Sequence, residues 1–227
     1  MRSLILSILA FACLAGVPRL AAQQLNWSST VGALDGSTIV DSTGAALDNT
    51  FVFELGAFLD GFTPDESNVD DWITNWRVFD QAAYNSGDIY FTGTANMLDD
   101  GTSDSPYQTS GAPSFEGLQA YIWIRNSDLA EEGSEWLLTR ADSWTFPTAT
   151  PGCCDNQGVV EWSVSDLDSG DIPVWGNQGG YEGGGSYTTT GPYTLQTYTF
   201  VPEPSSLLLA AVSGLLVFRR RRDPVFR

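Results

Sequence analysis

The acidic side chains are the groups in this chain with the most chemistry to offer, because the usual catalytic bases are missing. The 227 residues include no histidine and no lysine. This excludes Ser-His-Asp triads, Cys-His dyads, Schiff-base chemistry and histidine-ligated zinc or copper. Pairs of carboxylates about 5 to 10 Å apart, as glycosidases use, remain open. Glu54 and Glu161, which lie in strand-like runs beside aromatic residues, are the best candidates.

The abundance of acidic residues weakens the hypothesis that two of them form a catalytic carboxylate pair. Between residues 23 and 200 there are 26 Asp and Glu residues, so some pair will meet the glycosidase spacing by chance. We therefore expect no enzymatic activity and assign no catalytic residue. A glycoside-active enzyme is the third of three functional hypotheses.

Two acidic turns are candidates for calcium. Asp166, Asp168 and Asp171 stand at positions 1, 3 and 6 of one run, and the second run is 99–104. Neither completes an EF-hand loop, because position 5 lacks Asp or Asn and position 12 lacks Glu. Gly and Asp are also common turn formers. A calcium site and an ordinary acidic turn both remain open, and we expect no other cofactor.

Aromatic residues beside carboxylates also suit carbohydrate binding, since sugar rings stack on Trp or Tyr. Trp175 and, in the Gly-rich stretch 176–191, Tyr181 and Tyr187 are the rings expected to be most exposed. The alternative is that these rings pack in the core or the loop.

Cys153 and Cys154 are adjacent, and the only other cysteine, Cys13, lies near the N-terminus. A vicinal disulfide would close a strained ring within one turn. A link to a second molecule and two free thiols are the other outcomes.

The charge of residues 23–200 is strongly negative. Three arginines, Arg77, Arg125 and Arg140, face the 26 acids, which gives a formal net charge of −23. Such a surface repels nucleic acid, so nucleic-acid binding is excluded. The eight tryptophans all lie in this segment and argue against disorder, because large apolar rings can build a core.

Strand signals dominate residues 23–200. Short β-branched or aromatic runs bounded by Gly, Asn, Asp or Ser occur at 50–56, 88–93, 118–124, 135–139 and 193–200. The pairs 39–40 and 46–47, joined by a turn that contains Gly44, predict a hairpin. One helix is expected over 68–83, because Trp72, Trp76, Phe79 and Ala83 share a helical face, and residues 63–66 resemble its entry. These signals favour an antiparallel β-sandwich of the jelly-roll type with one short helix.

The N-terminus has the pattern of a secretory signal peptide. Arg2 is followed by an apolar region from Leu4 to Val17 and by a small-residue site that favours cleavage after Ala22. We expect a signal peptide over 1–22, export through the Sec translocon, and an acidic β-rich domain over 23–200.

The C-terminal segment 201–227 has an apolar run too short for a stable membrane span. Leu207 to Phe218 would make about 18 Å of helix, against about 30 Å of hydrocarbon. The residues before and after this run are Val201, Pro202, Glu203, Pro204, Arg219, Arg220, Arg221 and Arg222. The prolines keep the preceding segment extended and accessible, and the arginines would stay on the cytoplasmic side. An ordinary C-terminal anchor is the alternative to an address that is removed.

This order of a Pro-Glu-Pro triplet, a hydrophobic helix over about 205–218 and a basic stop over 219–222 resembles the PEP-CTERM sorting signal of exported bacterial proteins. The resemblance implies processing by exosortase, transient residence in the inner membrane, and delivery to the cell surface or the extracellular space. We therefore expect a non-enzymatic structural or interaction role, with a carbohydrate-binding module of the exopolysaccharide matrix as the alternative.

Overall fold

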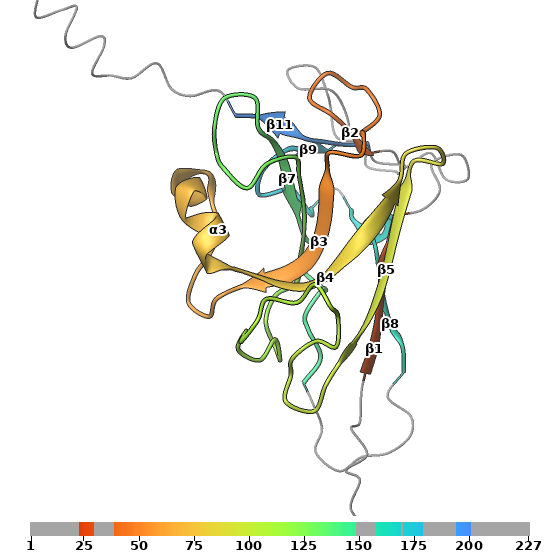
Figure 1. The fold of residues 1–227 in the computed structure, drawn as a ribbon, viewed down its shortest axis with the longest axis vertical. Coiled ribbons are helices and arrows are strands. Elements are labelled where there is room, and N and C mark those ends of the chain that lie inside the picture. The colour runs from red at the N-terminus through yellow and green to blue at the C-terminus, as the bar shows by residue number, and fades with distance from the viewer. Residues whose placement is uncertain (1–22, 30–38, 149–157, 169, 179–193, 201–227) are drawn as a thin grey trace, which may run out of the picture.

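The computed structural model describes residues 23–29, 39–148, 158–168, 170–178 and 194–200, and they form a mainly β domain (Figure 1). The elements, in chain order, are β1 (Gln23–Ser28), β2 (Ile39–Val40), β3 (Val52–Phe58), η1 (Glu66–Asp71), α3 (Trp72–Asn75), β4 (Trp76–Asn85), β5 (Tyr90–Met97), β6 (Tyr121–Arg125), β7 (Glu135–Thr139), β8 (Val160–Ser163), η2 (Val164–Asp166), β9 (Asn177–Gln178), β10 (Leu195–Gln196) and β11 (Tyr198–Thr199).

Eight strands form one curled sheet in the order β11-β7-β6-β3-β4-β5-β1-β8, and β2, β10 and β9 form a small second sheet. The sheets are mixed, because β1 pairs with β8 and β10 pairs with β2 in parallel. The expected mainly β class is confirmed. The antiparallel sandwich is not confirmed, since one large curled sheet carries most of the strands.

The five predicted strand regions all contain strands, and 135–139 matches β7 residue for residue. The predicted hairpin is confirmed by the antiparallel bridge between Val40 and Ala46, with Gly44 at a φ of 86°. The expected short helix is confirmed, but its predicted range of 68–83 is wrong. The helical segment ends at Asn75, and Trp76–Asn85 is a ten-residue strand that pairs with both β3 and β5. The predicted entry is confirmed, since Asp65 caps η1 and forms a capping box with Asn68.

The central strands are buried on both faces, which explains their nearly continuous apolar sequences. One face of β3, β6 and β7 carries Phe53, Leu55, Ile122, Ile124 and Leu137 into the larger core. The other face carries Phe58, Tyr121, Trp123, Trp136 and Leu138 into a second core, which Trp72 of α3 completes. The short helical segment is thus needed to cover this second face.

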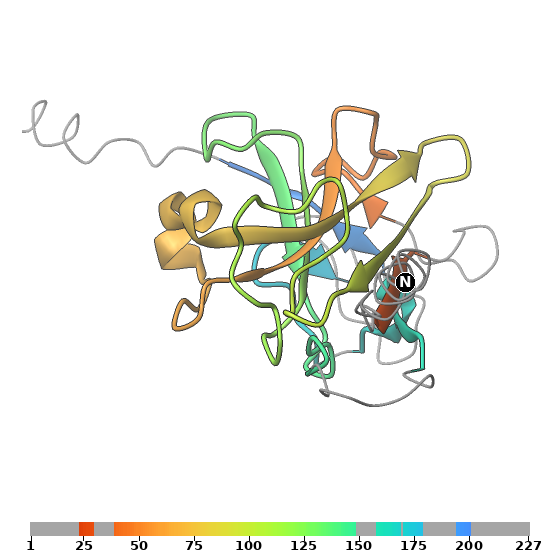
Figure 2. The same cartoon turned by 60° about the horizontal axis from the view of Figure 1, so that its bottom comes forward.

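Seven of the eight tryptophans are buried, so the expectation that the aromatic residues build a core is confirmed. Strands β1 and β8 lie away from α3, at the other end of the large sheet (Figure 2). Within the described part of the chain, no helix is both long and apolar enough to cross a membrane. The expected signal peptide, the hydrophobic tail, Cys153, Cys154, Tyr181 and Tyr187 lie outside the described residues.

Candidate functional site

Glu54 does not line a cleft but lies buried on the outer face of β3. Its Oε2 accepts hydrogen bonds from Arg125 Nη1 at 2.7 Å and from Trp76 Nε1 at 2.8 Å. Arg125 also donates Nε to Asp128 at 2.8 Å, and its guanidinium lies 4.3 Å from the ring centroid of Trp123. The charge of Glu54 is therefore committed to an ion pair inside the second core.

Glu161 lies in different surroundings from Glu54. It is an exposed residue of β8, four strands away from β3 in the large sheet, a path of about 19 Å along the curled sheet at the usual strand spacing. Glycosidases need their two carboxyl groups within about 10 Å and open to the same substrate. Because Glu54 is buried in the second core and Glu161 is exposed on β8, the two glutamates that the sequence singles out do not face one cleft.

The acidic turn at 166–171 uses its carboxylates to cap its own backbone. Asp166 Oδ2 accepts from Ser163 N at 2.9 Å, Asp168 Oδ1 from Gly170 N at 2.6 Å, and Asp171 Oδ2 from Asp168 N at 2.9 Å. Among the described residues, no group of three or more Asp, Glu, His or Cys is arranged to hold a metal ion. Calcium binding by Asp166, Asp168 and Asp171 stays a prediction.

The second acidic turn behaves in the same way. Asp100 Oδ1 accepts hydrogen bonds from the hydroxyl and the amide of Thr102, which hold the pKa of this carboxyl below its ordinary value. Asp104 accepts from the amide and the side chain of Asn96 at 2.7 Å each.

Trp175 is less exposed than expected. Its ring is half-buried and stacks on Phe200, with centroids 4.6 Å apart and an interplanar angle of 12°. Trp72 packs edge-on against it at 6.4 Å. Because neighbouring rings cover it, Trp175 belongs to the second core and does not offer a free stacking platform.

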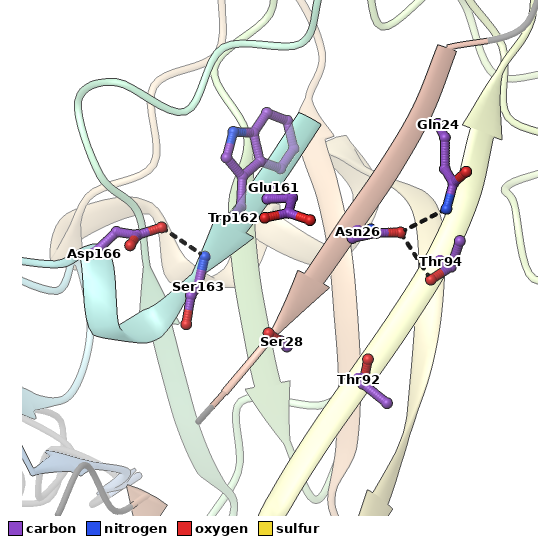
Figure 3. Close-up of a pocket in the computed structure, with 9 residues that line it drawn as sticks. All are labelled: Gln24, Asn26, Ser28, Thr92, Thr94, Glu161, Trp162, Ser163 and Asp166. Carbon is purple, nitrogen blue, oxygen red and sulfur yellow. Dashed lines mark hydrogen bonds between the residues drawn. The ribbon is translucent and has the colours of Figure 1, made fainter. Parts of the chain in front are cut away.

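The described residues form a polar groove over the outer faces of β5, β1 and β8, with a volume of about 640 Å³ (Figure 3). It exists because β1 alternates: Leu25 and Trp27 point into the core, so the residues between and beside them point outward. The lining residues are Gln24, Asn26, Ser28, Thr92, Thr94, Glu161, Trp162, Ser163 and Asp166.

Strand register arranges six of these side chains in two parallel rows. Asn26 of β1 lies between Thr94 and Glu161, and Ser28 lies between Thr92 and Ser163. Neighbours within a row are about 4.8 Å apart, and the rows are about 6.8 Å apart. The groove therefore presents a regular array of amide, hydroxyl and carboxylate groups.

A hydrogen-bond network fixes the middle of this array. Asn26 Oδ1 accepts from Gln24 Nε2 at 2.9 Å and from Thr94 Oγ1 at 3.1 Å (Figure 3). Its Nδ2 has no hydrogen-bond partner among the described residues. The exposed Glu161 carboxylate has none there either.

The strand under the groove is held in place from the core side. Trp27 Nε1 donates to Asp80 Oδ2 at 2.8 Å, and Ser105 Oγ donates to Asp80 Oδ1 at 2.6 Å. Asp80 and Trp27 are almost fully buried. Gly93 of β5 leaves room for this contact, because a Cβ there would lie 2.3 Å from Trp27 Nε1. β1 is thus fixed between β5 and β8.

Sequence reasoning singled out two groove residues, Glu161 and Asp166, but assigned them to other chemistry. It missed the other seven, which are Gln24, Asn26, Ser28, Thr92, Thr94, Trp162 and Ser163. For the three residues of β1, the signal was present in the strict alternation of polar and apolar residues over 24–28.

Comparison with known proteins identifies the C-terminal segment. Residues 200–222 match the family described as the PEP-CTERM protein-sorting motif. No curated protein and no solved structure matches the chain significantly.

Proposed function

We propose that this PEP-CTERM motif-containing protein has a non-enzymatic structural or interaction role at the cell surface or in the extracellular matrix. The motif at 200–222 is the observation that carries the proposal, since it implies an exported protein that exosortase sorts. The Sec translocon and, transiently, the inner membrane complete the route. The commitment of Glu54 to a buried ion pair and the position of exposed Glu161 on β8 support a role without catalysis.

The sorting step is tested by Glu203→Ala in the native host. Glu203 is the acid of the Pro-Glu-Pro triplet, so its loss should leave the precursor in the inner membrane. Asp223→Ala is the matched control, because it removes the same charge just outside the matched residues and should be sorted normally. Intact mass of the wild-type surface protein should show a chain that begins near Gln23 and lacks 219–227. A mature surface protein that still ends at Arg227 would contradict the proposal.

A carbohydrate-binding module of the exopolysaccharide matrix is the second candidate function. The polar groove over β5, β1 and β8 favours it, because its amides, hydroxyls and carboxylates suit a hydroxyl-rich ligand. The candidate surface for carbohydrate is therefore this groove, whose lining does not include Trp175. A glycan array separates the two functions, since a purely structural protein would bind no glycan.

A further inference from the structure

We propose that the groove over β5, β1 and β8 binds one chain of a neutral polysaccharide. The inference rests on the interaction role proposed above and names the site and the ligand class for it. All nine lining residues belong to the part of the chain that the structure describes.

The lining favours a ligand that both donates and accepts hydrogen bonds at many points. Amides and hydroxyls in the groove can do both, while Glu161 and Asp166 accept. The hydroxyls of a sugar chain offer donors and acceptors at closely spaced positions. The array of two rows, each three side chains wide, can meet several such hydroxyls at once.

Charge selects neutral chains over acidic ones. The groove contains two carboxylates and neither Lys nor Arg, and residues 23–200 carry a net charge of −23. A polyuronate, a sulfated chain or a phosphate would meet no cation there and would be repelled by the surrounding field.

An apolar ligand fits less well. The one aromatic residue in the lining, Trp162, is 6% exposed. Its ring packs against Phe146 and Trp144, with centroids 5.3 and 6.3 Å away. Little apolar surface is left to cover the body of such a ligand, so polar contacts must supply most of the binding.

The array is preorganised, which lowers the cost of binding. Asn26 is held by Gln24 and Thr94, so its free Nδ2 points in one direction. The strand that carries Asn26 is anchored through Trp27 to buried Asp80. Side chains on a paired strand with a fixed underside stay in position better than those on a loop.

The test measures binding of soluble dextran, β-glucan and galactomannan to the full chain, with polygalacturonate as the acidic comparison. The protein is kept in a polyoxyethylene detergent, which has no sugar head group, and binding is followed by affinity electrophoresis and calorimetry at one salt concentration. At least one neutral polysaccharide should bind, and polygalacturonate should bind at least tenfold more weakly.

The double variant Asn26→Ala/Thr94→Val removes the centre of the array without touching the core. It should weaken binding of the neutral chain at least tenfold and leave the melting temperature unchanged. Thr74→Val/Asn75→Ala is the matched control, because it removes the same two groups from α3, away from the groove, and should bind like the wild type.

Three outcomes would overturn the inference: no neutral polysaccharide binds, polygalacturonate binds more tightly, or the groove variant binds as well as the control. None of them bears on the sorting function, which the Glu203→Ala experiment decides separately. Conversely, normal sorting of Glu203→Ala would contradict the proposed sorting function alone. An affinity for neutral polysaccharides that depends on the groove would still support the inference.

Discussion

At the scale of single residues, Glu54 and Arg125 form a buried ion pair, with Arg125 Nη1 2.7 Å from Glu54 Oε2. A glutamate in an aromatic strand can be a catalytic acid or a partner in an ion pair. Arg125, 71 positions later, is the ion-pair partner of Glu54, because β3 and β6 are neighbours and place the two side chains on the same face. Local sequence does not contain that neighbour relation.

This ion pair leads to a prediction for stability. Arg125 and Glu54 are 6% exposed each, so Arg125→Met would leave a buried carboxylate without its cation. The expected loss is about 3–5 kcal/mol in the free energy of unfolding, measured by urea denaturation. Arg140→Met is the control, since Arg140 pairs with exposed Asp142 and should lose less than about 1 kcal/mol.

A double variant separates lost charge pairing from lost packing. Glu54→Gln/Arg125→Met removes both charges and should recover part of the stability that the single substitution loses. If Arg125→Met unfolded at the same urea concentration as Arg140→Met, the pair would contribute no more than a surface salt bridge.

At the scale of elements, short strands were predictable because their residues alternate or are β-branched between turn residues. The segment 76–85 was not. Trp72, Trp76 and Phe79 happen to fall on one helical face, yet Trp76 and Phe79 serve opposite faces of the sheet. Pairing with β3 and β5 outweighs local periodicity here, as tertiary context often does.

The groove could not be assembled from sequence alone for a similar reason. Its rows join β1, β5 and β8, and the parallel pair brings Asn26 beside Glu161, 135 positions away. Alternation in 24–28 predicts one polar face, but neither the partner strands nor their register. The partner strands and their register depend on long-range packing, because the face of β1 that carries Leu25 and Trp27 joins the larger core.

Gly93 gives the prediction at this scale. In Gly93→Ala the new methyl group would lie 2.3 Å from Trp27 Nε1 and 2.8 Å from Asp80 Oδ2, so β1 and β5 must shift. We expect a loss of about 1–3 kcal/mol, read from urea denaturation, and, if the groove binds a neutral polysaccharide as proposed, weaker binding because the array is displaced. Gly158→Ala is the control, since nothing lies within 4 Å of a Cβ there. Equal stability of the two variants would mean that the Trp27–Asp80 contact adapts without cost.

At the scale of the whole molecule, residues 23–200 carry a formal net charge of −23 at neutral pH. Hydrogen bonds from Thr50, Ser67 and Thr102 lower the pKa values of Asp48, Asp65 and Asp100. Since these pKa values fall below the ordinary 3.8, their hydrogen bonds stabilise the fold above that pH and are lost as pH falls through the lowered values. Acids held in this way stay ionised and contribute to the repulsion within the domain.

Salt should therefore stabilise the protein. Self-repulsion opposes compaction, and screening to a Debye length of about 8 Å at 0.15 M ionic strength relieves it. The melting temperature, followed by circular dichroism, should rise as NaCl is added.

Calcium adds a second test, because ligation by Asp166, Asp168 and Asp171 would raise the melting temperature further by mass action. Magnesium at equal ionic strength is the control: equal shifts with both ions would leave screening alone and remove the calcium site. A melting temperature that does not rise with any salt would contradict the repulsion argument, and would mean that the acids are already dispersed over the surface or paired with backbone donors.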